Sequence, residues 1–194
     1  MTPPRLLRPL RTAVAALLAS TALATAPAHA TAAPAAPTDL RTVLRCRVAT
    51  ATERPITFSP ELTLQPRTIR VTGTFRVTHC TSPDGSERNL RGGMAMVQGN
   101  ALASCTGASR ITGSGRIVWY DSAGRHAGVS HFRPLRDTVN GHNPGDAFLG
   151  GVVTSGPLTG AYLAGKATPT SDVSQCAGLG LRTVYGTGRL RFLR

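Results

Sequence analysis

The feature that most limits the fold of this chain is a strict alternation of apolar and polar residues. In the stretch RTIRVTGTFRVTHC, residues 67–80, Ile69, Val71 and Val77 alternate with arginine and threonine. A period of two places these two sets of side chains on opposite faces of a β-strand. No window of useful length shows the 3.6-residue apolar stripe of an amphipathic helix. The chain is therefore expected to be all-β.

Further strands are expected along the chain, about eight or nine in all, at the spacing that is typical of sandwiches and barrels. Residues 40–52 predict the first of them, because Leu44, Cys46 and Val48 share one face and arginines occupy the other. A short helix remains an alternative for this segment. The predicted fold is a single antiparallel β-sandwich or β-barrel.

A glycine-rich segment, GGVVTSGPLTGAYLAG at residues 150–165, allows two interpretations. A phosphate-binding loop would need glycines that open a helix behind a strand, together with a Lys-Ser/Thr pair, and this segment has neither. A hairpin with its turn at Ser155-Gly156-Pro157 explains the pattern, since glycine can adopt a positive φ. Gly160 and Gly165 are then expected within strands, where glycine marks bends or close backbone approach.

The N-terminus has the organisation of a secretory signal peptide. Three arginines in the first eleven residues precede a short apolar run and the sequence Ala28-His29-Ala30, which predicts cleavage after Ala30. The apolar run is too short to cross a bilayer, and no later run is long enough to do so. We expect a signal peptide at 1–30, an Ala/Pro-rich linker at 31–38 and one secreted β domain at 39–194.

Four cysteines follow this cleavage site, an even number that indicates two disulfides in an exported chain. Three connectivities are open to four cysteines, and the sequence does not choose among them. We prefer Cys46–Cys80 with Cys105–Cys176, because these pairs tie the early strands together and fix the C-terminal part to the middle. A metal site is disfavoured because CxxC and HxxxH spacings are absent. No cofactor is expected.

The chain is strongly basic, with 22 Lys and Arg residues against 9 Asp and Glu. Three arginines belong to the expected signal peptide, so the mature chain keeps 19 basic and 9 acidic residues, a net charge of +10. Such a protein is attracted to polyanions such as nucleic acid, teichoic acids or acidic polysaccharide, in a salt-dependent way. The use of arginine in place of lysine carries little weight, because an Ala-, Gly- and Pro-rich chain is typical of a high-GC genome.

Residues 121–146 are the most polar informative stretch and hold three of the histidines. One interpretation is a general acid–base centre, in which histidine moves protons near neutral pH and aspartate orients it. The other is a pair of exposed turns around one arginine-rich strand, which we prefer because polar residues collect in loops regardless of function. The catalytic candidates under the first interpretation are His126, His131, Asp121 and Asp137.

The same stretch contains the best local group for binding an anion: Arg125, Arg133 and Arg136. Arginines on either side of Pro134 can hold phosphate or sulfate with two hydrogen bonds each. The alternative is a solvated face without a ligand. Aromatic residues make up only 5% of the chain, so a stacking platform for single-stranded nucleic acid is not expected.

Several segments between Cys46 and about Phe192 carry a resemblance. They are TFSPELTL, the cysteine before TSPDGS, ASC, GGVVTSGPLTGA and SQCAGLGLRTVYGTG. In these segments the chain resembles small exported β-rich proteins from high-GC actinobacteria. The resemblance implies export and a disulfide-tied β domain. That group has no assigned activity, so no functional residue is transferred.

Three function classes fit these observations. The preferred one is a secreted, non-catalytic β-protein that acts as an extracellular or cell-surface binding module, with polyanionic wall polymer as its ligand. The second is a small exported hydrolase of phosphodiesters or polysaccharide that uses residues 121–146. The third is a secreted protein inhibitor that presents the turn TSPDGSERN. No specific protein partner is indicated.

Overall fold

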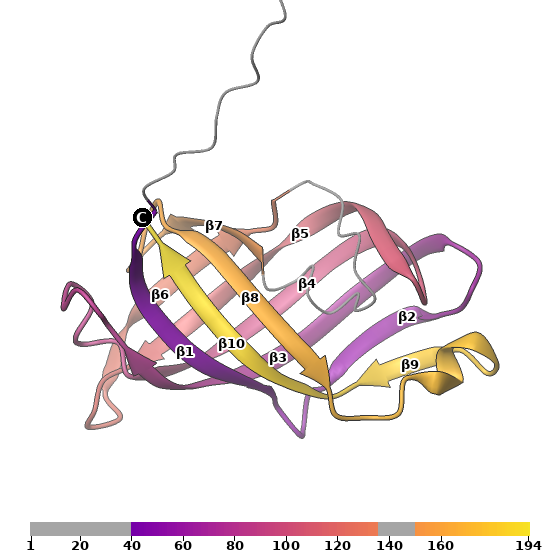
Figure 1. Ribbon diagram of the computed structural model, residues 1–194, viewed down its shortest axis with the longest axis horizontal. Coiled ribbons are helices and arrows are strands. Elements are labelled where there is room, and N and C mark those ends of the chain that lie inside the picture. Colours follow the sequence, from indigo (N-terminus) through magenta and orange to yellow (C-terminus); the bar gives the residue numbers. More distant parts are fainter. Residues whose placement is uncertain (1–39, 136–149) are drawn as a thin grey trace, which may run out of the picture. The chain divides into compact units, whose positions relative to one another are not determined.

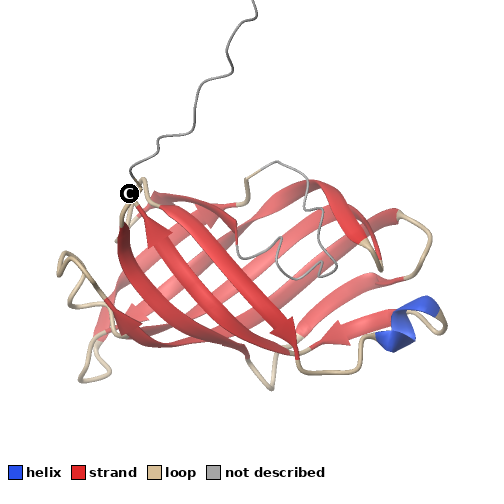
Figure 2. Ribbon diagram, viewed as in Figure 1, coloured by secondary structure: helices blue, strands red, loops and turns tan. Residues whose placement is uncertain are grey.

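The computed structural model describes residues 40–135 and 150–194. Almost all of its regular structure is β-strand, and one short 3-10 helix spans Ser174–Ala177 (Figures 1 and 2). The expected signal peptide and linker lie outside the described residues. The strands are β1 (Thr42–Thr50), β2 (Ile56–Leu62), β3 (Arg67–Thr81), β4 (Gly92–Ser104), β5 (Gly107–Tyr120), β6 (His126–Arg133), β7 (Gly150–Ser155), β8 (Tyr162–Pro169), β9 (Leu181–Val184) and β10 (Gly186–Leu193).

Eight of these strands close into an antiparallel barrel in the order β1-β10-β8-β7-β6-β5-β4-β3. The barrel closes because β1 pairs with β10 along one edge and with β3 along the other. The remaining two strands, β2 and β9, extend the sheet from β3 beyond the barrel. The all-β prediction is confirmed, and of the two predicted architectures the chain adopts the barrel. The described residues form ten strands, which is more than the expected eight or nine.

The strand β3 joins the barrel to this extension. It has 15 residues and pairs with β4 along most of its length. Its C-terminal part pairs with β1 and its N-terminal part with β2. The turn that connects β1 to β2 lies beside Thr74 of β3. The Thr74 carbonyl accepts a hydrogen bond from the Ala51 N–H, and the Thr74 N–H donates one to the Arg54 carbonyl. The turn between β1 and β2 is thereby fixed against β3.

Alternation along the strands fills the barrel with apolar side chains. Ile69, Val71 and Val77 of β3 are buried, as their spacing predicted. The largest fully buried side chain is Trp119, whose ring lies edge-on to Phe192 with 5.6 Å between ring centroids. Its indole N–H donates to the Ser130 hydroxyl at 2.8 Å, so the polar group of the tryptophan is satisfied inside the core.

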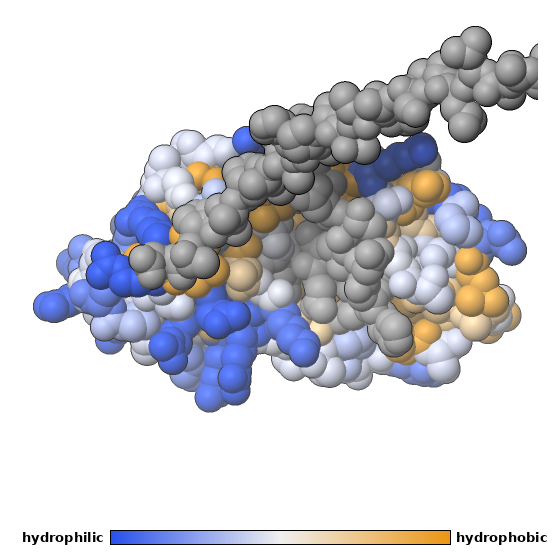
Figure 3. Space-filling model, turned by 45° about the horizontal axis from the view of Figure 1, so that its top comes forward, coloured by the Kyte–Doolittle hydropathy of each residue, from blue (hydrophilic) through white to orange (hydrophobic). Residues whose placement is uncertain are grey.

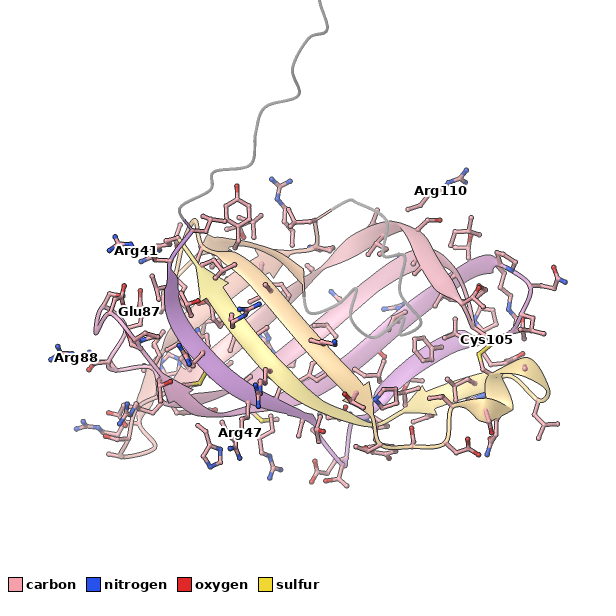
Figure 4. The ribbon with its side chains drawn as sticks, viewed as in Figure 1. Arg41, Arg47, Glu87, Arg88, Cys105 and Arg110 are labelled. Atoms are coloured by element: carbon pink, nitrogen blue, oxygen red, sulfur yellow. A yellow bond between two sulfur atoms is a disulfide. The ribbon has the colours of Figure 1, made fainter. Side chains whose placement is uncertain are left out.

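Both disulfides form with the preferred connectivity, and no cysteine is free. Cys46–Cys80 joins β1 to β3, at the seam where the barrel closes. Cys105–Cys176 joins the turn between β4 and β5 to the 3-10 helix, as the sulfur bond beside the Cys105 label in Figure 4 shows. The second bridge therefore holds the segment that leads into β9.

The glycine-rich segment is the hairpin of β7 and β8, as expected. Its turn is longer than predicted and covers residues 156–161, so Gly160 lies in the turn. Placing Gly160 within a strand was wrong, because both it and Gly156 adopt a φ of +81°, which suits a turn and not a strand. Gly165 does lie within β8, opposite Leu190.

Candidate functional site

The outer wall of the barrel carries arginines on two neighbouring strands. Along β1, Arg45 and Arg47 alternate with the buried Cys46 and Val48, and both arginines are exposed. Along β10, Arg189 and Arg191 alternate with buried residues in the same way. The alternation that fills the barrel with apolar side chains thus directs every second residue outward, and Figure 4 shows Arg47 on this outer side.

The register of the sheet places these cations directly opposite one another. Arg47 pairs with Arg189 across β1 and β10, and Arg189 pairs in turn with Lys166 on β8. Arg45 pairs with Arg191 in the next outward row. Neighbouring strands lie about 4.8 Å apart and successive outward residues about 6.7 Å apart. Five cationic side chains therefore form two adjacent rows across three strands.

We call this group the basic cluster; it consists of Arg45, Arg47, Lys166, Arg189 and Arg191. These residues line a groove of about 730 Å³ in which the described lining includes no acidic residue. Within residues 40–135 and 150–194, none of the five makes an ion pair or a side-chain hydrogen bond. Figure 3 shows strongly hydrophilic side chains gathered over the wall that β1, β10 and β8 form.

His79 adds a further nitrogen-bearing side chain at the β3 side of this groove. It stands where the pairing of β1 with β3 shifts register, between Arg45/Thr81 and Arg47/Thr78. Its φ is +51°, a left-handed conformation that is uncommon for residues other than glycine. The bulge directs the exposed His79 side chain into the groove beside the arginines.

The acidic residues that do bind arginines lie elsewhere. Glu61 pairs with Arg67 at 2.9 Å and with Arg182 at 3.4 Å, and Glu87 pairs with Arg194. The pKa of Glu61 is lowered by its own backbone N–H and by the Arg67 guanidinium. Like charges directly opposite on one sheet face are destabilising, so the basic cluster lowers stability while paired arginines elsewhere do not.

Of the anion-binding residues that the sequence predicted, Arg125 is neutralised locally. Its guanidinium pairs with Asp121 at 2.9 Å. The backbone N–H of Arg125 lowers the pKa of Asp121, and its side chain adds to this effect. Arg133 is exposed at the end of β6, in a different groove from the basic cluster. Arg136 lies outside the described residues.

The three catalytic candidates within the described residues, His126, His131 and Asp121, do not come together in one site. His126 and His131 are five residues apart on β6, about 16 Å at the usual rise of a strand. His131 Nδ1 lies 3.1 Å from the Ser155 hydroxyl, on an exposed surface. Asp121 is occupied by Arg125 and by the backbone of its own turn. Asp137 lies outside the described residues.

Two further findings concern the described part of the chain. Its His, Cys, Asp and Glu side chains do not gather into a group of three or more that can hold a metal ion. A helix with the length and hydrophobicity of a membrane span is absent from residues 40–135 and 150–194.

Comparison with protein-family models, curated proteins and solved structures finds no match to this chain.

The basic cluster was not identified from the sequence, although its elements were visible there. Arg45 and Arg47 stand opposite the apolar face of the first predicted strand, and RLRF near the C-terminus has the same alternation. Residues 45–47 and 189–191 are separated by most of the domain. The pairing of β1 with β10, the first and last strands of the chain, brings these residues together when the barrel closes.

Proposed function

We propose that this protein is an exported, non-catalytic binding module that holds a polyanionic polymer of the cell wall or the extracellular space on its basic cluster. The observation that carries this proposal is the position of Arg47, Arg189 and Lys166 directly opposite one another on neighbouring strands, with Arg45 and Arg191 beside them. A row of this kind is costly without a counter-charge and favourable when a chain of anionic groups lies along it.

The shape of the site agrees with a polymer in preference to a single small anion. Two rows of cations about 6.7 Å apart present several binding points on one continuous wall. Arginine is suited to phosphate, sulfate and carboxylate groups because its planar guanidinium can donate two parallel hydrogen bonds. The two disulfides are consistent with an oxidising compartment outside the cytosol.

Chromatography on immobilised heparin tests the proposal. We expect the mature protein to be retained, and the double variant Arg47→Gln/Arg189→Gln to elute at clearly lower salt. In binding measurements, the slope of log K against log salt should fall in magnitude by roughly 1.4–1.8 when two contacts are lost.

The matched control is Arg88→Gln/Arg110→Gln, which removes the same charge from two exposed positions. Figure 4 shows both residues projecting from other parts of the barrel than Arg47. The control should keep nearly wild-type retention. If both double variants elute at the same salt, binding reflects net charge alone and the basic cluster is not the site.

A further inference from the structure

A second groove lies on the wall of the barrel that faces away from the basic cluster. It has a volume of about 910 Å³ and crosses the outer face of β3, β4, β5 and β6. In the closed order of strands, three strands separate β10 from β5 in either direction. Figure 1 accordingly shows β1, β10 and β8 in front of the fainter β4, β5 and β6.

Cations stand around this groove as well. Arg116 projects from β5 and Arg133 from β6, and Arg54 contributes from the turn that is fixed against β3. All three are exposed, and within residues 40–135 and 150–194 none of them has an ion-pair partner. Glu53 is the one acidic residue in the described lining, so the groove keeps a positive balance.

The floor of the second groove differs from that of the first, because a row of neutral hydrogen-bonding side chains crosses it beside the apolar Met96, Val97 and Phe132. Thr57, Thr72, Gln98 and Ser114 lie directly opposite one another across β2, β3, β4 and β5. The side chains of Gln98 and Ser114 are exposed, and among the described residues they make no hydrogen bond. Hydroxyl and amide groups of this kind donate and accept hydrogen bonds at once, as sugar hydroxyls require.

We propose that this second groove binds a sugar unit that carries an anionic group, so that one molecule holds an acidic polysaccharide at two opposite walls. The Thr57–Ser114 row takes the sugar hydroxyls, and Arg116 and Arg133 take the charged substituent. The volume lies within the range of about 300–1,000 Å³ that is common for small-ligand sites. This inference rests on the proposed function and names acidic polysaccharide as the polymer class.

Binding sites on two opposite walls allow one molecule to hold two polysaccharide chains at once. A ligand held at one wall leaves the other wall free for a second chain, because the barrel stands between them. The protein then cross-links polysaccharide chains instead of only coating them.

The number of binding sites tests the inference. We expect titration calorimetry with a heparin-derived octasaccharide to give two sites per protein, and one site for Arg116→Gln/Arg133→Gln. The variant Arg47→Gln/Arg189→Gln should also lose one site, namely the other. Long-chain heparin should become turbid with the wild-type protein and stay clear with either double variant, while light scattering without polymer excludes self-association.

The sugar specificity is tested by Gln98→Leu, with Asn100→Leu as its control. Asn100 lies two residues further along β4 and outside the groove lining. Loss of a hydrogen bond from Gln98 should weaken octasaccharide binding at the second groove roughly three- to tenfold. Inorganic polyphosphate accepts hydrogen bonds but donates none, so it can use only the donor half of the Gln98 amide. Gln98→Leu should therefore weaken polyphosphate binding less than octasaccharide binding, and Asn100→Leu should weaken neither.

The outcomes separate this inference from the proposed function. One octasaccharide per molecule, lost in Arg47→Gln/Arg189→Gln and kept in Arg116→Gln/Arg133→Gln, overturns the second groove and leaves the basic cluster as a site. Two sites with Gln98→Leu unchanged overturn the role of sugar hydroxyls. No binding to the wild-type protein overturns the proposed function together with this inference.

Discussion

Replacing Arg189 with glutamate should make the protein more stable and, at the same time, impair its binding to polyanions. Arg189 stands between Arg47 on β1 and Lys166 on β8, so it takes part in two like-charge pairs. Glutamate at this position converts both of them into pairs of opposite charge. The expected gain comes from removing two repulsions and from adding two attractions in their place.

The magnitude follows from the two pairs. A directly opposite charge pair on a sheet is worth about 0.2–1 kcal/mol, and exposed pairs lie toward the lower end of that range. Changing the sign of two such pairs should raise the free energy of unfolding by about 1 kcal/mol at low ionic strength. For a domain of this size that corresponds to an increase in Tm of about 2–4 °C.

The chain offers a matched control in Arg70→Glu. Arg70 is also an exposed arginine on the outer face of a barrel strand, but its opposite neighbours are Ser59 and Asn100, which are neutral. The control therefore makes the same change in net charge and in strand propensity, without removing a direct repulsion. The difference between the two variants isolates the contribution of the cluster.

Urea unfolding under non-reducing conditions, at low salt and at about 1 M NaCl, measures this difference. We expect Arg189→Glu to be more stable than Arg70→Glu at low salt and the gap to shrink at high salt, where the Debye length is about 3 Å. Heparin retention should change in the opposite direction and fall only for Arg189→Glu. If Arg189→Glu is no more stable than Arg70→Glu at low salt, the cations do not repel one another and the reasoning fails.

Two further predictions concern the hairpin and the carboxylates. Gly156→Ala should cost clearly more stability than Gly160→Ala in thermal unfolding. Both glycines have a φ of +81°, but only at Gly156 would the new Cβ collide with another residue, at the Val129 carbonyl oxygen. Equal costs would show that the backbone conformation alone matters. The folded-state pKa values of Asp84 and Asp121 are lowered, so the stability they provide is present above the ordinary value of 3.8 and is lost as the pH falls through their folded values. Tm should therefore drop below about pH 4, and less steeply when either aspartate is replaced by asparagine; an unchanged slope would contradict this.

The sequence predicted those properties that depend on residues close together in the chain. The period of two along residues 67–80 is enough to identify a strand and its buried face, because alternate side chains point to opposite faces wherever the strand lies. The disulfides are an exception, because they join cysteines 34 and 71 residues apart. The sequence left three connectivities open, and the preferred one is confirmed. The turn of the glycine-rich hairpin was placed too narrowly, since it covers residues 156–161 and includes Gly160 with its φ of +81°.

The candidate site could not be predicted in the same way, because it depends on register. Shifting β10 by one residue against β1 would turn Arg189 and Arg191 toward the interior, and shifting it by two would separate Arg47 from Arg189. Neither shift changes the apolar and polar alternation within β1 or within β10, so the sequence of either strand alone does not reveal the register between them. Residues 121–146 were predicted as a candidate site because their polar residues are close together in the chain. The basic cluster instead brings together residues as far apart in the sequence as Arg45 and Arg191.

Closure of the barrel explains why the two walls can carry different chemistry. In an open sheet, an edge strand must be protected against pairing with other chains. Here β3 and β10 cover the two edges of β1, and the apolar face of every barrel strand turns inward. The outer residues are thus released from any part in the core. A row of like charges on β1, β10 and β8 and a row of neutral hydroxyl and amide side chains that begins on β2 can then coexist on the outside of one molecule, because neither row is needed to fill the core.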